Sequence, residues 1–212
     1  MSSVVPEIWT YCENLSTAPS EYLDQIERDT HLHTLQPRMI SGRLQGRLLS
    51  MLSKMLAPTR ILELGTFTGY SALCLAEGLA PTGKLISLEN NAEMQTRILQ
   101  NWAKSPYFKQ MELIIGDALQ TLPHLNDTFD LIFLDADKQN YLNYYEILLG
   151  KLRAGGILLA DNVLWSGKII DQEAQDKKTK ALRLFNDFVS QDKRVELVML
   201  PFRDGLSCIR KK

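Results

Sequence analysis

The chain has 212 residues, 45% of them hydrophobic, which is enough for one globular α/β domain with a full core. Its net charge of −1 offers no general attraction to nucleic acid or to a membrane surface. The three cysteines form no CxxC pair, which argues against a disulfide framework and a cysteine metal site. No apolar run reaches the roughly 18 residues that cross a bilayer, and no signal-peptide pattern is present. We therefore expect a cytoplasmic protein.

Residues 1–35 predict two helices that lie outside the main sheet. The apolar residues of the first recur at helical spacing, namely Val5, Ile8, Trp9 and Cys12. Pro19 and Ser20 separate this pattern from a second one around Leu23 and Ile26. We expect this appendage to cover a substrate site or to pair with another subunit. Two packed helices without a function are the alternative.

A third helix is predicted over residues 44–55. Leu44, Leu48, Met51, Leu52 and Met55 share one face at helical spacing, so this face is expected to be buried. The helix ends before Pro58, because proline cannot continue the hydrogen-bond ladder.

From residue 60 onward, short apolar strands alternate with helices, which is typical of a parallel sheet covered by helices on both faces. The expected strands are Arg60–Leu64, Lys84–Leu88, Met111–Ile115, Phe129–Leu134 and Ile157–Ala160. Gly155 and Gly156 are expected to turn the chain into the fifth strand. Residues 166–180 are polar and predict a surface loop before the last helix.

Two further strands flank the Asp204-Gly205 turn, at Val195–Leu200 and Leu206–Arg210. They complete a mostly parallel seven-stranded sheet that ends in an antiparallel strand. We find no internal repeat or linker. The fold class is therefore α/β, in a single domain over residues 1–212.

Acidic residues follow five successive strands. They are Glu63, Glu89, Asp117, Asp135 and Asp161. In an open parallel sheet, ligands bind beyond the carboxyl ends of the strands. Carboxylates gathered there repel one another unless a cation is near. This edge of the sheet is therefore the predicted functional site.

The segment from Glu63 to Ser71 has the order strand, glycine turn, helix, which presents backbone N–H groups to a nucleotide-like ligand. Its Gly65-x-x-x-Gly69 spacing is neither a pyrophosphate fingerprint nor a phosphate loop. Glu89, at the end of the next strand, suits the two ribose hydroxyls of a nucleoside, because a carboxylate offers two acceptor oxygens. The pattern favours a nucleoside without a diphosphate.

Asp135, Asp161 and Asn162 form a second group of candidate residues. Oxygen ligands without histidine or cysteine select Mg²⁺, Mn²⁺ or Ca²⁺. Lys138, three residues beyond Asp135, is a candidate base for a nearby hydroxyl. The alternatives are that Asp161-Asn162 is a turn, Asp135 a helix cap and Lys138 an exposed lysine. Trp165 and Tyr141 are expected either to wall a planar substrate or to serve in packing.

Four segments together resemble the cation-dependent O-methyltransferases, the family of the caffeoyl-CoA and catechol enzymes and their bacterial relatives. They are Glu63–Ser71, Gly116–Ala118, Leu134–Lys138 and Ala160–Gly167. The resemblance runs from about Pro37 to the C-terminus. It implies the Rossmann-like fold of S-adenosylmethionine-dependent methyltransferases, with residues 36–212 as the donor- and metal-binding core. It also implies a homodimer.

The resemblance assigns roles residue by residue. The implied donor-binding residues are Ser41, Glu63, Gly65, Thr66, Ser71, Glu89, Ala118 and Asp137. The implied metal ligands are Asp135, Asp161 and Asn162, with Mg²⁺ as the usual ion and Mn²⁺ or Ca²⁺ as alternatives. Lys138, beside Asp135, matches the lysine proposed as catalytic base in the catechol enzymes. The implied reaction methylates a vicinal diol on an aromatic ring, in a catechol, a hydroxycinnamate or its CoA ester.

Two departures from the family pattern leave the acceptor open. Ser166 stands where plant enzymes acting on the CoA thioester commonly carry Asn, and Pro201-Phe202-Arg203 precedes the Asp204-Gly205 turn where glycine is more usual. A second hypothesis is methylation of a hydroxylated uridine in tRNA, which the basic end at residues 210–212 favours and the net charge does not. A third is a non-catalytic nucleoside-binding protein.

Overall fold

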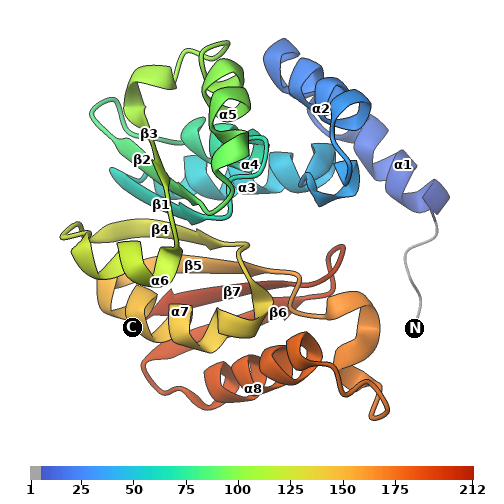
Figure 1. Ribbon diagram of the computed structural model, residues 1–212, viewed down its shortest axis with the longest axis vertical. Coiled ribbons are helices and arrows are strands. Elements are labelled where there is room, and N and C mark those ends of the chain that lie inside the picture. The colour runs from blue at the N-terminus through green and yellow to red at the C-terminus, as the bar shows by residue number, and fades with distance from the viewer. Residues whose placement is uncertain (1–5) are drawn as a thin grey trace.

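A computed structural model describes residues 6–212 of the chain, so Val5 of the first helical pattern lies outside the described residues. A seven-stranded sheet in the order β3-β2-β1-β4-β5-β7-β6 runs through the molecule (Figure 1). Its strands are β1 Arg60–Leu64, β2 Lys84–Glu89, β3 Met111–Ile115, β4 Phe129–Leu134, β5 Leu152–Asp161, β6 Val195–Leu200 and β7 Leu206–Lys211. β3, β2, β1, β4 and β5 pair in parallel, and β7 is antiparallel to both of its neighbours. The predicted sheet is confirmed.

Helices cover both faces of this sheet (Figure 1). The α-helices are α1 Pro6–Leu15, α2 Glu21–His33, α3 Gly42–Leu56, α4 Tyr70–Ala76, α5 Gln95–Trp102, α6 Ala118–Thr121, α7 Tyr141–Lys151 and α8 Lys177–Gln191. Short 3₁₀ turns include η2 Ala92–Met94, η4 Leu122–His124, η5 Lys138–Asn140 and η6 Trp165–Ile170. One core lies under α2 to α5, and the other lies under α7 and α8. None of the helices between residues 6 and 212 is long and apolar enough to cross a membrane.

The central strands are apolar along their whole length because both of their faces are buried. In β1, Leu62 and Leu64 pack into the core beneath α7 and α8, whereas Ile61 packs into the core beneath α3 and α4. Glu63 also points to this second side and is fully buried. A carboxylate in such a position requires internal partners, which the site supplies.

Two expectations about segment boundaries were wrong. β5 begins at Leu152, and Gly155, with φ +73°, lies inside the strand at a bulge opposite β4 instead of in a turn before it. Residues 177–180 belong to α8 and not to a surface loop. Asp176 caps this helix by accepting a hydrogen bond from the Thr179 amide at 3.1 Å, a side-chain cap that starts the helix earlier than its apolar residues indicate.

The apolar face predicted for α3 is only partly buried, with Leu48 and Leu52 packed against the core. Met51 and Met55 are 61% and 77% exposed, whereas Ser50 and Ser53 are buried. The reason is a polar seam with α4: Ser50 donates to the Glu77 carboxylate and Ser53 donates to a backbone carbonyl of α4, each at 2.6 Å. Hydrogen bonding between the two helices therefore decides which face of α3 is buried.

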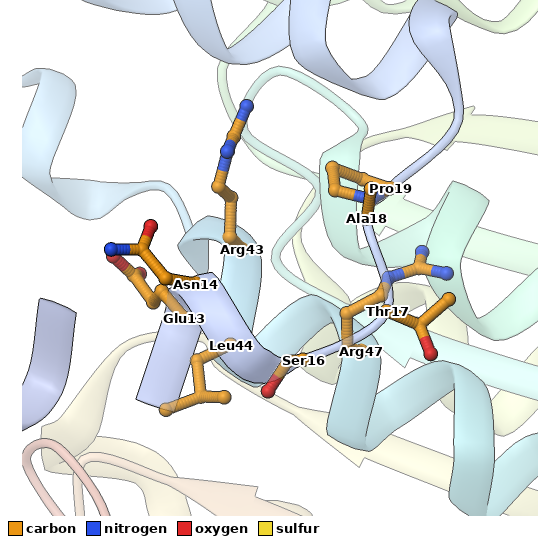
Figure 2. Close-up of a pocket in the computed structure, with 9 residues that line it drawn as sticks. All are labelled: Glu13, Asn14, Ser16, Thr17, Ala18, Pro19, Arg43, Leu44 and Arg47. Carbon is orange, nitrogen blue, oxygen red and sulfur yellow. The ribbon is translucent and has the colours of Figure 1, made fainter. Parts of the chain in front are cut away.

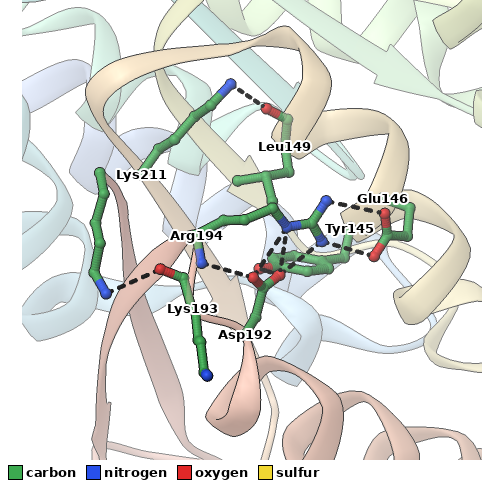
Figure 3. Close-up of polar contacts among 8 residues, drawn as sticks. Tyr145, Glu146, Leu149, Asp192, Lys193, Arg194 and Lys211 are labelled. Carbon is green, nitrogen blue, oxygen red and sulfur yellow. Dashed lines mark hydrogen bonds and ion pairs between the residues drawn. The ribbon is translucent and has the colours of Figure 1, made fainter.

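A polar network ties the last two strands to α7 (Figure 3). The Arg194 guanidinium bridges the carboxylates of Glu146 and Asp192, at 2.9 and 2.7 Å. The Tyr145 hydroxyl donates to Asp192 at 2.8 Å, and the Lys211 ammonium donates to the Leu149 carbonyl at 2.8 Å. These contacts anchor the start of β6 and the end of β7 to α7.

Candidate active site

The site begins where the chain reverses its direction of winding, at the adjacent strands β1 and β4. The loop after β1 and the loop after β4 touch through their main chains. The Asp135 amide donates to the Leu64 carbonyl at 2.8 Å. Gly65 has φ +94°, and a Cβ atom there would overlap the Asp135 carbonyl oxygen, so only glycine fits. The nucleoside loop and the predicted metal site are thus in backbone contact.

Glu89 holds the loop after β1 in shape. Its Oε2 atom accepts hydrogen bonds from the backbone amides of Thr66 and Phe67, at 3.1 and 2.8 Å, and its Oε1 atom accepts one from the Asn91 amide at 2.8 Å. The sequence points to Glu89 only as a ribose acceptor. Its role in holding the loop was missed, because the contact depends on the parallel pairing of β1 with β2.

Glu63 lies beneath the same loop. The hydroxyls of Ser71 and Ser87 donate to its two carboxylate oxygens at 2.6 and 2.5 Å, and Thr66 shares a 2.6 Å hydrogen bond with Ser87. Burial raises the pKa of Glu63 to about 8, although both serine hydrogen bonds act in the opposite direction. Glu63, Thr66 and Ser71 are therefore placed to support the loop from below.

The remaining predicted donor residues come from three separate segments. Ala118 begins α6 after β3, and Asp137 caps η5 after β4, with its carboxylate accepting a hydrogen bond from the Asn140 amide group at 2.9 Å. Both follow strands at the edge of the sheet that carries Gly65. Ser41 is buried just before α3. The sequence alternative of a helix cap thus applies to Asp137 and not to Asp135.

Lys138 contacts the Asp135 carboxylate and, through Tyr141, the main chain of Asp161. It is only 8% exposed, so the alternative of an exposed lysine was wrong. Its ammonium lies 2.5 Å from Asp135 Oδ1 and donates to the Tyr141 hydroxyl at 2.7 Å. Tyr141 donates in turn to the Asp161 carbonyl oxygen at 2.8 Å. Burial raises the pKa of Tyr141 well above its ordinary value, so the phenol stays protonated.

Asp161 ends β5 almost completely buried, at 4% exposure. Its Oδ1 atom accepts a hydrogen bond from the backbone amide of Asn162 at 2.8 Å, and its Oδ2 atom accepts one from Gln45 Nε2 at 2.6 Å. Burial and the nearby Asp135 carboxylate raise the pKa of Asp161 to about 6. Asn162 adopts a left-handed conformation with φ +58°. This geometry turns the chain beyond the sheet edge.

These residues fit a hard cation. Two neighbouring carboxylates raise the free energy of both charges, and a bound cation removes that repulsion. Within residues 6–212, no three histidine, cysteine, aspartate or glutamate side chains cluster closely enough to hold a metal ion. The third oxygen donor that the sequence resemblance implies beside Asp135 and Asp161 is Asn162, which directly follows Asp161. This oxygen-only set matches the preference of Mg²⁺ or Mn²⁺.

Of the two alternatives given for the aromatic residues at this end, packing holds for Tyr141. Tyr141 is fully buried beneath the site and does not wall it. Trp165 is half-buried with φ +48°, and the Lys178 ammonium lies 5.7 Å from the centre of its ring. Gln45 carried no sequence signal, because a single polar residue on a helix matches no motif, and Arg203 was noted only as part of the unusual Pro201-Phe202-Arg203 segment.

A pocket of about 140 Å³ lies apart from the strand ends, between the α1–α2 connection and α3 (Figure 2). It is lined by Glu13, Asn14, Ser16, Thr17, Ala18, Pro19, Arg43, Leu44 and Arg47. Its arginines are already paired, Arg43 with Asp24 and Arg47 with Glu77. It contains none of the predicted site residues, and we assign it no ligand.

Comparisons with known proteins agree with this geometry. The caffeoyl-CoA O-methyltransferase of Petroselinum crispum is 34% identical over 180 residues, which are 79% of this chain and 74% of that protein. The mouse (Mus musculus) catechol O-methyltransferase domain-containing protein 1 is 38% identical over 168 residues, 77% of this chain. That match spans 64% of the mouse protein.

Solved structures superpose closely. The SAH-bound methyltransferase PaMTH1 of Podospora anserina has a TM-score of 0.90 at 32% identity and covers 97% of this chain and 94% of its own. The Bacillus cereus O-methyltransferase in complex with SAH has a TM-score of 0.91 at 27% identity and covers 97% of both chains. The fold is thus that of the S-adenosylmethionine-dependent methyltransferases, as the resemblance implied. The O-methyltransferase family model matches residues 13–212, and the chain belongs to this family.

Proposed function

We propose that this protein transfers a methyl group from S-adenosylmethionine to one hydroxyl of an aromatic vicinal diol, with the help of a divalent cation. The observation that carries the proposal is the main-chain contact between Gly65 and Asp135. It fixes a nucleoside-type loop directly against an oxygen-only ligand set. A methyl donor bound at the loop would therefore lie next to an acceptor bound at Asp135 and Asp161.

The donor side is proposed to consist of the residues named from the resemblance. Glu89 Oε1 accepts a single backbone hydrogen bond and keeps lone pairs for a ribose hydroxyl. Gly65 leaves room for a ligand close to the backbone. Glu63, being fully buried, acts by supporting the loop from below.

On the acceptor side, Asp135, Asp161 and Asn162 would hold the cation. When bound, the cation supplies Lewis acidity and orients the diol. Lys138, in its neutral amine form, would accept the hydroxyl proton and become the ammonium, and its contacts with Asp135 and the Tyr141 phenol would hold the nitrogen in place. Alignment of the two substrates contributes several kcal/mol, roughly 7 or more for well-oriented groups. Trp165 is the aromatic side chain placed to contact the ring.

Methylation of tRNA is the weaker candidate. Two basic residues at the C-terminus already have partners at the surface: Arg210 pairs with Glu196 at 3.0 Å, and Lys212 donates to the Lys193 carbonyl at 3.0 Å. A non-catalytic nucleoside-binding protein would not need the buried Lys138 beside Asp135. The donor-consumption test described below distinguishes both candidates from the proposed function.

The expected homodimer and cytoplasmic location belong to the same proposal. α1 and α3 pack on each other and leave large apolar side chains exposed, among them Tyr11, Leu15, Met51 and Met55. A second copy would cover such side chains. Light scattering of the purified protein tests the homodimer, and a monomeric mass would contradict it.

The acceptor is tested by donor consumption. Catechols, hydroxycinnamates, their CoA esters and tRNA are each incubated with labelled S-adenosylmethionine, with Mg²⁺ or with a chelator. We expect transfer to a diol that stops in chelator. Transfer to a catechol that persists in chelator would show the cation role to be wrong, and transfer to tRNA alone would replace the proposed acceptor.

A further inference from the structure

Gln45 is a buried side chain that links two distant parts of the acceptor side. It lies on α3 and is 1% exposed. Its Nε2 atom donates to Asp161 Oδ2 at 2.6 Å, across 116 residues of sequence. Its Oε1 atom accepts from Arg203 Nη1 at 2.9 Å. An amide thus joins a guanidinium in the β6–β7 turn to the carboxylate that ends β5.

The chemistry of these two neighbours fixes the direction of the Gln45 amide. A carboxylate only accepts hydrogen bonds, and a guanidinium only donates them. The reversed amide would place its oxygen against Asp161 and its NH₂ group against Arg203, which would leave buried polar atoms unpaired. The amide is therefore held in one orientation, and Asp161 Oδ2 receives its hydrogen bond from one direction.

Arg203 is itself held in place. Its guanidinium donates to the carbonyl oxygens of Ser41 and Ile40, just before α3, with 3.1 Å between Nη2 and the Ile40 oxygen. Its backbone has φ +50° in the β6–β7 turn. These hydrogen bonds occupy the guanidinium, so it connects α3 to the turn instead of binding an acceptor. Arg203 also belongs to the Pro201-Phe202-Arg203 segment, where the sequence departs from the family pattern.

We propose that Gln45 and Arg203 are positioning residues for the Asp161 carboxylate, an inference that rests on the proposed cation site. The backbone amide of Asn162 donates to Oδ1 and Gln45 donates to Oδ2, so the plane of the carboxylate is fixed before a cation binds. Partners that hydrogen-bond a metal ligand typically change metal affinity by about 10–100-fold. Arg203 acts one step further out, by fixing the amide that fixes the carboxylate.

The test measures Mn²⁺ affinity of the full-length protein by electron paramagnetic resonance of free Mn²⁺, and S-adenosylmethionine affinity by calorimetry. Gln45→Leu replaces the amide with an apolar group and removes both hydrogen bonds. We expect Mn²⁺ affinity to fall by about 10–100-fold while donor affinity stays unchanged. Arg203→Met should weaken Mn²⁺ binding in the same direction, and Arg203→Lys, which keeps a donor for the amide oxygen, should restore part of it.

Gln110→Leu is the matched control. Gln110 Nε2 also braces the fold, by donating to the carbonyl oxygens of Ala80 and Gly83 at 3.1 and 3.0 Å, away from the site. An equal loss of Mn²⁺ affinity in this control, or an unchanged affinity in Gln45→Leu, overturns the positioning role. If Gln45→Leu does not fold, the two substitutions at the half-exposed Arg203 provide the test, and unchanged Mn²⁺ affinity in Arg203→Met then overturns the positioning role. The cation site itself is refuted if the wild type does not bind Mn²⁺, or if Asp161→Ala binds Mn²⁺ as tightly as the wild type.

Discussion

The donor side and the acceptor side of the site are built in different ways. The donor side uses neighbouring strands. Glu63 lies within β1 and accepts a hydrogen bond from Ser71, and Glu89 ends β2 and accepts hydrogen bonds from the backbone of the loop after β1. The acceptor side is assembled from far apart, since Asp161 depends on Gln45 in α3 and Gln45 depends on Arg203 near the C-terminus. The first is a local arrangement and the second exists only in the complete fold.

The change expected to disrupt both sides is Gly65→Ala. The added Cβ would collide with the Asp135 carbonyl at a residue with φ +94°, so both loops must move. Misplacement of about 1 Å costs on the order of 10²-fold in rate, and the donor site is lost as well, so we expect activity to fall by roughly 10³-fold or more. Gly150→Ala is the control, because no atom lies within 4 Å of its added Cβ. Turnover assays of both variants decide, and an active Gly65→Ala would contradict the close contact.

The acceptor side alone should fail in Asp161→Ala. Loss of a buried ligand carboxylate removes cation-dependent transition-state stabilisation worth several kcal/mol, so turnover should fall by about 10²-fold or more. Because the donor loop is held by Glu89 and not by Asp161, donor affinity should remain that of the wild type. Calorimetry with S-adenosylmethionine measures this separation, and a parallel loss of donor affinity would mean that the two sides are not independent.

The converse change is Glu89→Gln. The variant loses the charge that accepts three backbone hydrogen bonds, and hydrogen bonds to charged groups contribute about 1.5–3 kcal/mol. Donor affinity should fall by roughly 10–100-fold, whereas Mn²⁺ affinity should not change. Equal weakening of both ligands would contradict the division into two sides.

An effect on stability, and not on either ligand, is the pH dependence due to Glu63. Its pKa is raised from 4.5 to about 8 in the folded protein, so the folded state binds the proton more tightly than the unfolded state. Its contribution is complete below pH 4.5 and is lost as the pH rises towards 8, with a slope of at most about 1.4 kcal/mol per pH unit. Glu63→Gln should flatten this slope in urea unfolding measured across that range. An unchanged slope would show that Glu63 is ionised when folded.

The same contrast explains what the sequence could predict. The strands, the glycine loop and the row of acids at the strand ends follow from periodicity and turn chemistry, which are local properties. The bulge at Gly155 and the early start of α8 depend on strand register and on the Asp176 cap. The relation of Gln45 to Arg203 could not be predicted, because it requires that α3 and the β6–β7 turn meet. The burial of α3 likewise depends on its hydrogen bonds to Glu77 and to α4, so Met51 and Met55 were expected in the core although they are exposed.

The contact between Gly65 and Asp135 also separates what can be redesigned from what cannot. It joins main chain to main chain, so side chains that support neither loop can be substituted without changing the spacing between the two loops. Trp165, Ser166 and Phe202 contribute nothing to this contact. A combinatorial library over these three positions, with Gln45 and Arg203 retained, would vary the accepted ring while methyl-transfer geometry stays constant. If the proposed function holds, the molecule would combine a fixed reaction centre with an exchangeable recognition surface.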